Sequence, residues 1–234
     1  MKLKTTLFIG FIAFTLTASA NAFKKVAYIP SYRMAHLEDI NYNLITHVMA
    51  AFANPDEEGN LSYDGYDMHT FVSLVHSNNA EAIISIGGGG DYSWGAKVAI
   101  YESLFSSQES RTDFIHKIMT YMRTYNFDGL DNDLEGNALA LANFNAFTQE
   151  LGDSLHANGY EYSAAIGVGG TWGVNYWDDE SLNKLDFIMT MSYGGVGDWN
   201  YALKTDDHTF DKMKTDRKKL ILSEANKFIK QNTI

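Results

Sequence analysis

Three acidic residues alternate with other residues near the middle of the chain, in the stretch D-G-L-D-N-D-L-E at 128–135. The side chains of a β-strand point alternately to its two faces, so a strand here would carry Asp131, Asp133 and Glu135 on one face. Carboxylates held that close together raise the pKa of at least one member, which keeps a carboxylic acid protonated near neutral pH. The stretch therefore predicts acid catalysis, with the outermost acid, Glu135, as the proton donor.

Two alternative interpretations account for the same acidic stretch less well. A solvated acidic turn does not explain the apolar Phe127 or the leucines between the acids. A calcium-binding EF-hand loop matches at 131–136, but its twelfth position is Ala142, where that loop requires a bidentate glutamate. The seven histidines show no metal-binding spacing. We therefore expect neither a metal ion nor a cofactor at this site.

The acids need a scaffold of strands, and the rest of the sequence supplies one. Short apolar runs alternate with longer amphipathic stretches, which is typical of βαβ units and a parallel sheet, whose chemistry lies at the carboxyl ends of the strands. We predict an α/β fold, a (β/α)8 TIM-type barrel. The sequence does not decide whether the C-terminal end completes the barrel, because only 220–222 suggests a seventh strand and a full barrel takes roughly 250 residues. The predicted strands are 26–30, 46–53, 82–87, 129–135, 162–168 and 186–193, and the predicted helices are 67–77, 111–125 and 139–157.

The acidic stretch also resembles a known family. It matches the D-G-x-D-x-D-x-E signature of glycoside hydrolase family 18, the chitinases and endo-β-N-acetylglucosaminidases, at all five specified positions. The segment S-I-G-G at 85–88 is similar to the S-x-G-G at the end of the family's third strand, and A-F-A at 51–53 is similar to the end of its second. Tyr28 lies where the first strand of the family carries an aromatic residue. The resemblance extends from about residue 25 to 193.

The resemblance implies retaining hydrolysis assisted by the substrate, without metal or cofactor. Glu135 would protonate the glycosidic oxygen while the 2-acetamido carbonyl of the sugar attacks the anomeric carbon. Asp133 would hold the acetamido N–H, and Asp131 would share a proton or hydrogen bond with Asp133. Tyr193 stands where the family's tyrosine bonds the acetamido oxygen. The aspartate that usually follows this tyrosine is replaced by Gly194.

Other differences from the family concern sugar binding. Asp198, four residues beyond Gly194, could fold back toward the position of the missing aspartate, but a loop residue seldom reproduces a strand-end position. The tryptophan of the family's eighth strand has no counterpart. We expect altered substrate preference or lower activity from these changes. Trp177 is a weaker candidate for sugar contact than the other aromatic residues. The candidate substrate-binding residues are Tyr28, Phe52, Gly87, Gly88, Trp94, Trp172 and Trp199.

Residues 1–22 are typical of a secretory signal. Two lysines precede an apolar run, and A-N-A at 20–22 fits a cleavage site. A membrane anchor needs roughly 20 apolar residues, and the run at 7–16 is shorter. We therefore expect a signal peptide at 1–22, one catalytic barrel at 23–234 without a linker or internal repeat, and a secreted or periplasmic protein with no membrane association after cleavage.

The amino-acid composition limits the chemistry and the binding partners that we expect of this protein. The chain has no cysteine, which excludes cysteine catalysis and thiolate metal sites. Its formal charge is −11, and loss of Lys2 and Lys4 with the signal makes it −13. Phosphate backbones bind mainly lysine and arginine, so nucleic acid is excluded as a partner. We expect an N-acetylglucosamine-containing polysaccharide or oligosaccharide as the ligand, and the sequence leaves the oligomeric state open.

Three functions remain compatible with the sequence. The first is hydrolysis of β-1,4-linked N-acetylglucosamine polymers such as chitin. The second is an endo-β-N-acetylglucosaminidase acting on N-glycans, which the missing aspartate after Tyr193 suggests. The third is a lectin-like chitin binder with little or no turnover, although the retained Glu135 argues against it. If the residues after about 216 do not complete the barrel, an exposed sheet edge would invite aggregation or pairing with another chain.

Overall fold

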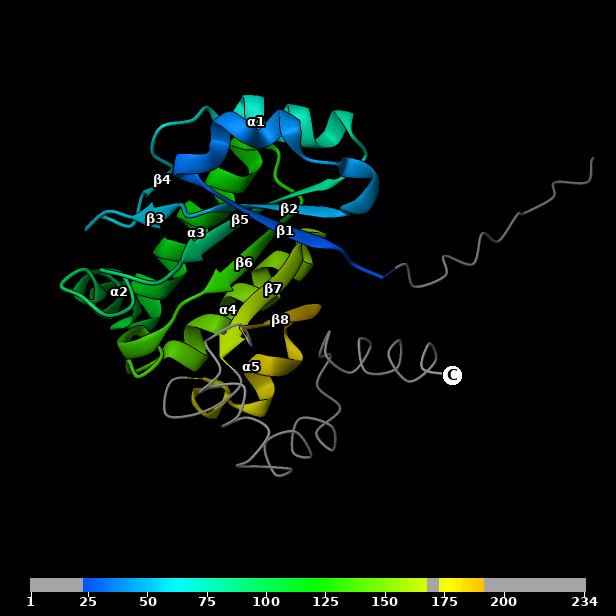
Figure 1. The fold of residues 1–234 in the computed structure, drawn as a ribbon. Helices are drawn as coiled ribbons and strands as arrows, with labels where there is room; N and C mark the ends of the chain where they lie inside the picture. The colour runs from blue at the N-terminus through cyan, green and yellow to red at the C-terminus, as the bar shows by residue number, and fades with distance from the viewer. Residues whose placement is uncertain (1–22, 168–172, 192–234) are drawn as a thin grey trace, which may run out of the picture.

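The computed structural model describes residues 23–167 and 173–191 (Figure 1). Six parallel strands form one sheet in which each strand pairs with the next long strand along the chain. All six predicted strands are present, with small differences in their ends. They are β1 (Val26–Pro30), β2 (His47–Ala51), β5 (Glu81–Gly87), β6 (Gly129–Asp133), β7 (Glu161–Gly167) and β8 (Phe187–Met191).

Helices connect these strands and cover one face of the sheet, as Figure 1 shows for α1, α3 and α4. Within residues 23–167 and 173–191, none of the helices has the length and apolar character needed to cross a membrane. The α-helices are α1 (Met68–Ser77), α2 (Val98–Phe105), α3 (Gln108–Tyr125), α4 (Phe144–Ala157) and α5 (Asp179–Asn183). Short 3-10 helices span Ser31–Asp39, Tyr42–Leu44, Gly136–Ala138 and Val174–Tyr176, and β3 (Asn54–Pro55) pairs antiparallel with β4 (Leu61–Ser62).

The predicted helices are all found, but two begin elsewhere. The helix predicted at 111–125 begins at Gln108, because the Ser107 side chain caps it by accepting the Ser110 N–H at 3.1 Å. The helix predicted at 139–157 begins only at Phe144, after Asn143 in the left-handed region at φ 66°. The β3–β4 pair, α2 and α5 were not predicted. The predicted signal at 1–22 and the candidate strand at 220–222 lie outside the described residues.

The outer face of the sheet carries most of the core. Leu130 of β6 and Leu134 just beyond it are fully buried there among the helices. Rings from α2, α3 and α4 stack beside them, with Phe147 4.3 Å from Phe105 and 5.5 Å from Phe114 between ring centroids. The inner face holds a much smaller apolar cluster. The sheet is therefore anchored from outside, and its inner face is left for polar side chains.

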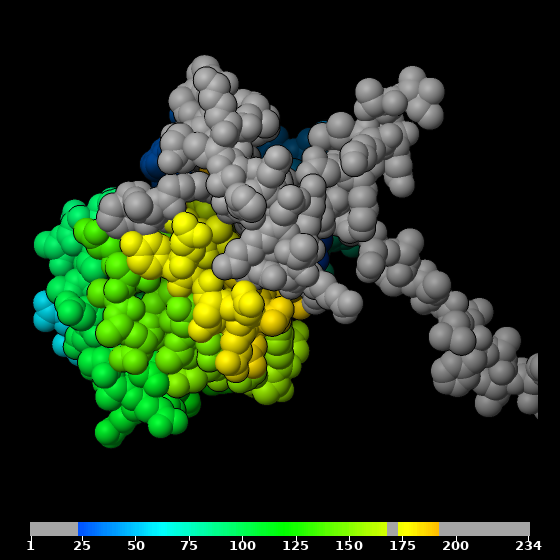
Figure 2. Space-filling model, turned by 90° about the horizontal axis from the view of Figure 1, so that it is seen from below, coloured from blue at the N-terminus to red at the C-terminus, as the bar shows by residue number. Residues whose placement is uncertain are grey.

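The last described elements close against α4. Figure 2 shows residues 173–191, in yellow and orange, directly against the green surface that includes this helix. Asn145 donates from Nδ2 to the Tyr176 carbonyl at 2.9 Å, and Gln149 donates from Nε2 to both carboxylate oxygens of Asp178. These hydrogen bonds join α4 to the segment that leads into β8. The position of β8 in the sheet is thus fixed from its outer side as well as by pairing with β7.

The first acid of the 128–135 stretch, Asp128, lies at the amino end of β6, opposite to the other three acids. Its Oδ2 accepts the backbone N–H of Ala82 at 2.7 Å and a hydrogen bond from Nε2 of His76 at 2.6 Å. One carboxylate thus joins β5, the end of α1 and the start of β6. This places Asp128 in the scaffold and separates it from the catalytic end of the strand.

A second aspartate in the described part of the chain makes the same pair of contacts, with a backbone N–H and a histidine. Asp186, just before β8, accepts the Tyr162 N–H at 3.0 Å and a hydrogen bond from His156 at 3.1 Å. The segments that lead into β5 and β7 share the pattern H-x-N-x-x-E, at 76–81 and 156–161. In both segments the residue after the shared asparagine, Asn79 or Gly159, has positive φ. The short repeat was not recognised in the sequence, and it fixes two helix-to-strand turns in the same way.

We expect Asp128→Ala to lower the free energy of unfolding by about 1–3 kcal/mol, because it leaves a buried backbone N–H without an acceptor. Asp128→Asn retains an acceptor oxygen and should lose less. Asp186→Ala removes the equivalent contact and should cost a similar amount. Urea unfolding of the three variants measures this, and an Asp128→Ala midpoint equal to that of the wild type would contradict the assignment.

Candidate active site

The three predicted catalytic acids gather at the carboxyl end of β6. Asp131 and Asp133 point to the inner face of the sheet and expose only 0% and 6% of their surface. Hydrogen-bonded pairing of β6 ends at Asp133, two residues earlier than predicted, but the backbone stays extended at Glu135, at φ −129° and ψ 169°. The alternation therefore continues to Glu135, and the prediction that the acids share one face is confirmed.

Asp131 is held by three hydroxyl groups. The sheet register sets Ser85 of β5 and Ser163 of β7 on either side of it, in one row across three strands. Ser85 donates to Oδ2 at 2.7 Å, Tyr28 of β1 donates to Oδ2 at 2.9 Å, and Ser163 donates to Oδ1 at 2.9 Å. Burial raises the pKa of Asp131 above its ordinary value, and the three hydrogen bonds offset only part of that rise. Three O–H donors make Asp131 the member of the pair suited to hold the negative charge.

Asp133 has the opposite environment. Its Oδ1 is buried and has no hydrogen-bond partner among the described residues. Burial, followed by the nearby charges of Asp131 and Glu135, raises the pKa of Asp133 to about 9. Because the three hydroxyl donors described above all bind Asp131, the proton that the pair retains at neutral pH belongs on Asp133. The two environments therefore favour the negative charge on Asp131 and the proton on Asp133.

Glu135 is half-buried, and this burial raises the pKa of its carboxyl group. A raised pKa keeps the proton on a carboxylic acid at a pH where an exposed glutamate would have lost it. Its backbone N–H donates to the Ser93 hydroxyl at 3.0 Å. Glu135 therefore combines the protonation state and the fixed backbone that a general acid requires.

The glycines at the end of β5 bring the loop that follows this strand close to the acids. Gly87 has φ +97°, and a Cβ on it would lie 2.6 Å from the Asp133 carbonyl oxygen. A Cβ on Gly88 would lie 2.4 Å from the Phe52 ring. Asn54 holds the turn from the other side, donating to the Gly87 carbonyl at 3.0 Å and accepting the Gly87 N–H at 2.9 Å. These glycines therefore serve close packing at the site.

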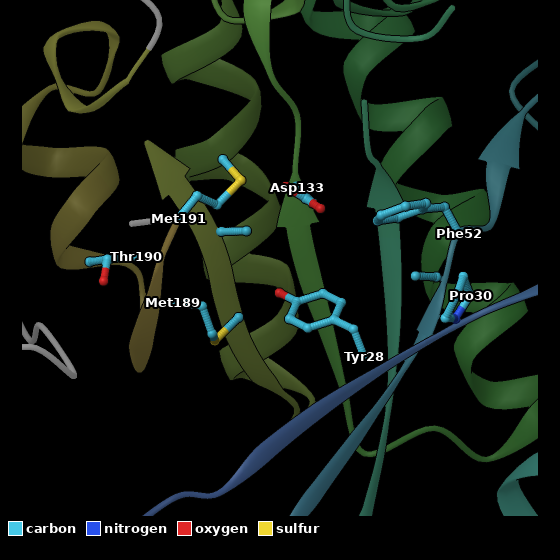
Figure 3. A pocket seen from close by; sticks show the side chains of 9 residues that line it. Tyr28, Pro30, Phe52, Asp133, Met189, Thr190 and Met191 are labelled. Atoms are coloured by element: carbon cyan, nitrogen blue, oxygen red, sulfur yellow. The ribbon is translucent and has the colours of Figure 1, made fainter. Parts of the chain in front are cut away.

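A pocket of about 210 Å³ opens above Asp133. Figure 3 shows Tyr28 in its centre, with Phe52 on one side and the two methionines of β8 on the other. Two predicted substrate-binding residues, Tyr28 and Phe52, therefore lie in the pocket wall. The remaining lining is mostly apolar, so the Asp133 carboxyl is a polar group aimed into an apolar hollow. The lining residues are Tyr28, Pro30, Ala51, Phe52, Asp133, Ala165, Met189, Thr190 and Met191.

The tryptophan predictions have different outcomes. Trp94 is described and 44% exposed, and its ring covers Gly136, where a Cβ would lie 2.5 Å from the ring. Trp177 is buried against Phe144 with its ring edge-on, 5.0 Å between centroids, as a core residue. The predictions for Tyr193, Gly194, Asp198, Trp172 and Trp199 concern positions outside the described residues.

Several residues of the site were not singled out from the sequence. The sequence predicts no role for Ser93, Ser163 or Asn54, and Ser85 appears there only as part of a motif. Ser85 and Ser163 are each a polar residue at an inward position of an otherwise apolar strand, and this is the signal that identifies them. Ser93 lies in a loop, where no periodicity applies. Among the described residues, no group of three or more His, Asp or Glu side chains is placed to hold a metal ion.

Comparison with known proteins gives the family. The model of glycosyl hydrolases family 18 matches residues 24–231. The chain belongs to this family. The match covers most of the sequence, including every acid and hydroxyl described above. Family membership, predicted from the 128–135 stretch, is confirmed.

Individual relatives agree with this membership. The chain is 28% identical to a probable chitinase 2 of Drosophila melanogaster over 194 residues, which are 74% of this chain and 39% of the relative. The crystal structure of the GH18 chitinase ChiB of Flavobacterium johnsoniae superposes with a TM-score of 0.72 at 26% identity, over 84% of this chain and 66% of that one. A chitinase-like agglutinin of Robinia pseudoacacia superposes with a TM-score of 0.62 at 26% identity, over 72% of this chain and 54% of that one.

These likenesses confirm the predicted TIM-type fold class. The described residues supply six of the eight strands of such a barrel. The chain spans about two fifths of the fly relative and about two thirds of the bacterial structure.

Replacement by alanine should lower stability by different amounts at two glycines of the 87–90 stretch. Gly87→Ala places a Cβ against the Asp133 carbonyl at a positive φ, so we expect it to cost about 1–3 kcal/mol or more in unfolding free energy. Gly89→Ala meets only Oε1 of Glu135, at 3.6 Å, and should cost about 0.5 kcal/mol or less. Chemical denaturation measures both. Equal losses would show that the stretch is not packed as described.

The raised pKa of Asp133 makes stability depend on pH. The pKa of Asp133 in the folded protein, about 9, lies above its ordinary value of 3.8. The stability that the protonated side chain contributes is therefore complete below pH 4 and is lost as the pH rises toward 9. Asp133→Asn cannot ionise and avoids this loss. We therefore expect the melting temperature of Asp133→Asn minus that of the wild type to increase from pH 4 to pH 9. A difference that stays constant or falls over this range would contradict the assignment.

Proposed function

We propose that this protein hydrolyses β-1,4-linked N-acetylglucosamine polymers, chitin or chito-oligosaccharides, by retaining, substrate-assisted catalysis. The observation that carries the proposal is the division of roles among the three acids. Asp131 accepts hydrogen bonds from three hydroxyls, whereas Oδ1 of Asp133 has no partner among the described residues. The pKa of Asp133 is raised to about 9, and burial raises the pKa of Glu135. Retention without a second nucleophilic carboxylate is the exception that family 18 makes to the two-carboxylate scheme.

Each acid has one task in this reaction. Glu135 gives its proton to the glycosidic oxygen as the bond from that oxygen to the anomeric carbon breaks. The acetamido carbonyl oxygen of the same sugar forms the new bond to the anomeric carbon. Asp133 accepts the acetamido N–H through Oδ1, which has no hydrogen-bond partner among the described residues, and Asp131 supports it electrostatically. Water then attacks the anomeric carbon as its bond to the acetamido oxygen breaks, the Glu135 carboxylate takes a proton from this water, and the acetamido group and the original configuration are restored.

The pocket above Asp133 is our proposed position for the sugar whose linkage is cleaved. Its apolar walls suit the faces of a pyranose ring, with Tyr28 and Phe52 as aromatic contacts. Trp94 is exposed next to Gly136 and would contact sugar on the leaving-group side of Glu135. Gly87 and Gly88 would act through close packing. For Tyr193, Trp172 and Trp199, the proposed substrate contacts rest on the sequence.

Export belongs to the same proposal. A polymeric substrate such as chitin is met outside the cytoplasm, and the family match begins at residue 24, directly after the predicted cleavage at Ala22. We propose a signal peptide at 1–22, a catalytic barrel at 23–234 and a secreted or periplasmic location. Detection of a mature protein that begins at Phe23 in culture fluid or periplasm would support this, and retention of the full chain in the cytoplasm would contradict it.

A chitin-binding protein with little turnover is the second candidate. The likeness to a chitinase-like agglutinin favours it, as does Gly194 in place of the family aspartate. The three acids favour the hydrolase, because a binder needs neither a proton donor nor a neutral aspartate.

Release of a fluorophore from chitobiose and chitotriose glycosides tests the proposal. We expect turnover by the wild type, and a fall of at least about 100-fold in kcat for Glu135→Gln, because general-acid catalysis contributes about 10²–10⁴-fold. Glu150→Gln, at a glutamate that pairs with Arg111 between α3 and α4, is the matched control and should leave kcat within about twofold.

The outcomes separate the candidates. Equal rates for wild type and Glu135→Gln would remove Glu135 as the acid. Binding of chito-oligosaccharide by both proteins without turnover by either would replace the hydrolase with the binder. Turnover on a high-mannose glycoprotein, but not on chitin oligomers, would assign the N-glycan substrate.

A further inference from the structure

The loop after β5 is bonded to the chain that carries the acids. Gly88 N–H donates to the Asp133 carbonyl at 2.8 Å, and Asn137 N–H donates to the Ser93 carbonyl at 2.8 Å. The two segments, 88–95 and 133–137, thus run side by side with a hydrogen bond at each end. Glu135 lies between these two bonds. Its backbone is therefore held by a loop more than 40 positions earlier in the sequence.

Ser93 supplies the central contact between these segments. It is 0% exposed, its Oγ donates to the Gly88 carbonyl at 2.7 Å, and the same oxygen accepts the Glu135 N–H at 3.0 Å. A hydroxyl group has one proton to donate and lone pairs to accept, so both bonds form together. The hydroxyl therefore ties the glycine turn to the backbone of the general acid. Replacing it would leave a buried N–H and a buried carbonyl without partners.

The same loop encloses the acid side chain. Gly89 lies close enough that a Cβ on it would be 3.6 Å from Oε1 of Glu135. Trp94, next to Ser93, packs its ring over Gly136, next to Glu135. Burial is the cause of the raised pKa of Glu135, and this loop provides part of that burial. Position and protonation of the acid thus depend on one loop.

We propose that Ser93 is a positioning residue for Glu135: the Ser93 hydroxyl fixes the backbone of the acid and holds it against the enclosing loop. The inference rests on the proposed function of Glu135 as proton donor. It assigns to a loop serine a role in the reaction without contact to substrate. Small displacements of a catalytic group are costly, since misplacement by about 1 Å lowers rates by about 10²-fold.

Ser93→Ala tests this by two independent readouts. We expect kcat on chitotriose glycosides to fall about tenfold or more with KM within about twofold, because substrate contacts remain. We also expect the ¹³C NMR titration of the Glu135 carboxyl, assigned with Glu135→Gln, to move to lower pH as the freed segment admits water. Ser93→Thr keeps the hydroxyl and should restore both properties. If threonine does not fit, as melting would show, Ser93→Cys with its weaker hydrogen bonds should give intermediate values.

Ser181→Ala is the matched control. Ser181 is equally buried and its hydroxyl donates to the Asn145 carbonyl at 3.2 Å, away from the acids. It should lose stability but keep the kcat and the Glu135 titration of the wild type. A Glu135 titration that does not move in Ser93→Ala, or that moves equally in Ser181→Ala, would overturn the proposal. The titration needs no turnover, so an inactive wild type would reject the hydrolase while the role of Ser93 is still decided.

Discussion

The site depends on one buried negative charge. Asp131 is completely enclosed, and a charge in such a place is stable only where donors surround it. Three hydroxyls, from β1, β5 and β7, supply those donors and use up the hydrogen-bonding capacity around it. The neighbouring Asp133 is then left beside a fixed charge with no donor for its Oδ1 among the described residues, and it keeps its proton. The asymmetry between two chemically identical residues follows from their surroundings alone.

The parallel sheet makes this arrangement possible. Register sets Ser85, Asp131 and Ser163 in one row, so donors from neighbouring strands reach the same carboxylate without any loop. The outer core under Leu130 and Leu134 holds β6 in place from behind. Asp128, at the other end of the strand, connects β5 to the start of β6. Four acids of one short stretch therefore serve two ends of the strand, the scaffold at one and the chemistry at the other.

Much of this was predictable because strands have a strict period of two. The alternation of acids and leucines gave the face of Asp131, Asp133 and Glu135, and the apolar runs gave the six strands. Motif resemblance gave the family. The start of α3 was missed because Ser107 sets it by capping, a contact that amphipathic periodicity does not reveal. The role of Ser93 could not be predicted, because a loop has no period and its contact with Glu135 spans 42 positions.

The central claim is that the two buried aspartates share one proton and that Asp133 holds it. Titration of their side-chain carboxyls by ¹³C NMR tests this directly, with Asp131→Asn and Asp133→Asn to assign the signals. The account predicts that one carboxyl, assigned to Asp133, remains protonated at neutral pH and ionises near pH 9, and that Asp131→Asn lowers this value. If both carboxyls were ionised at pH 7, or if the retained proton belonged to Asp131, the proposed division of roles would be contradicted.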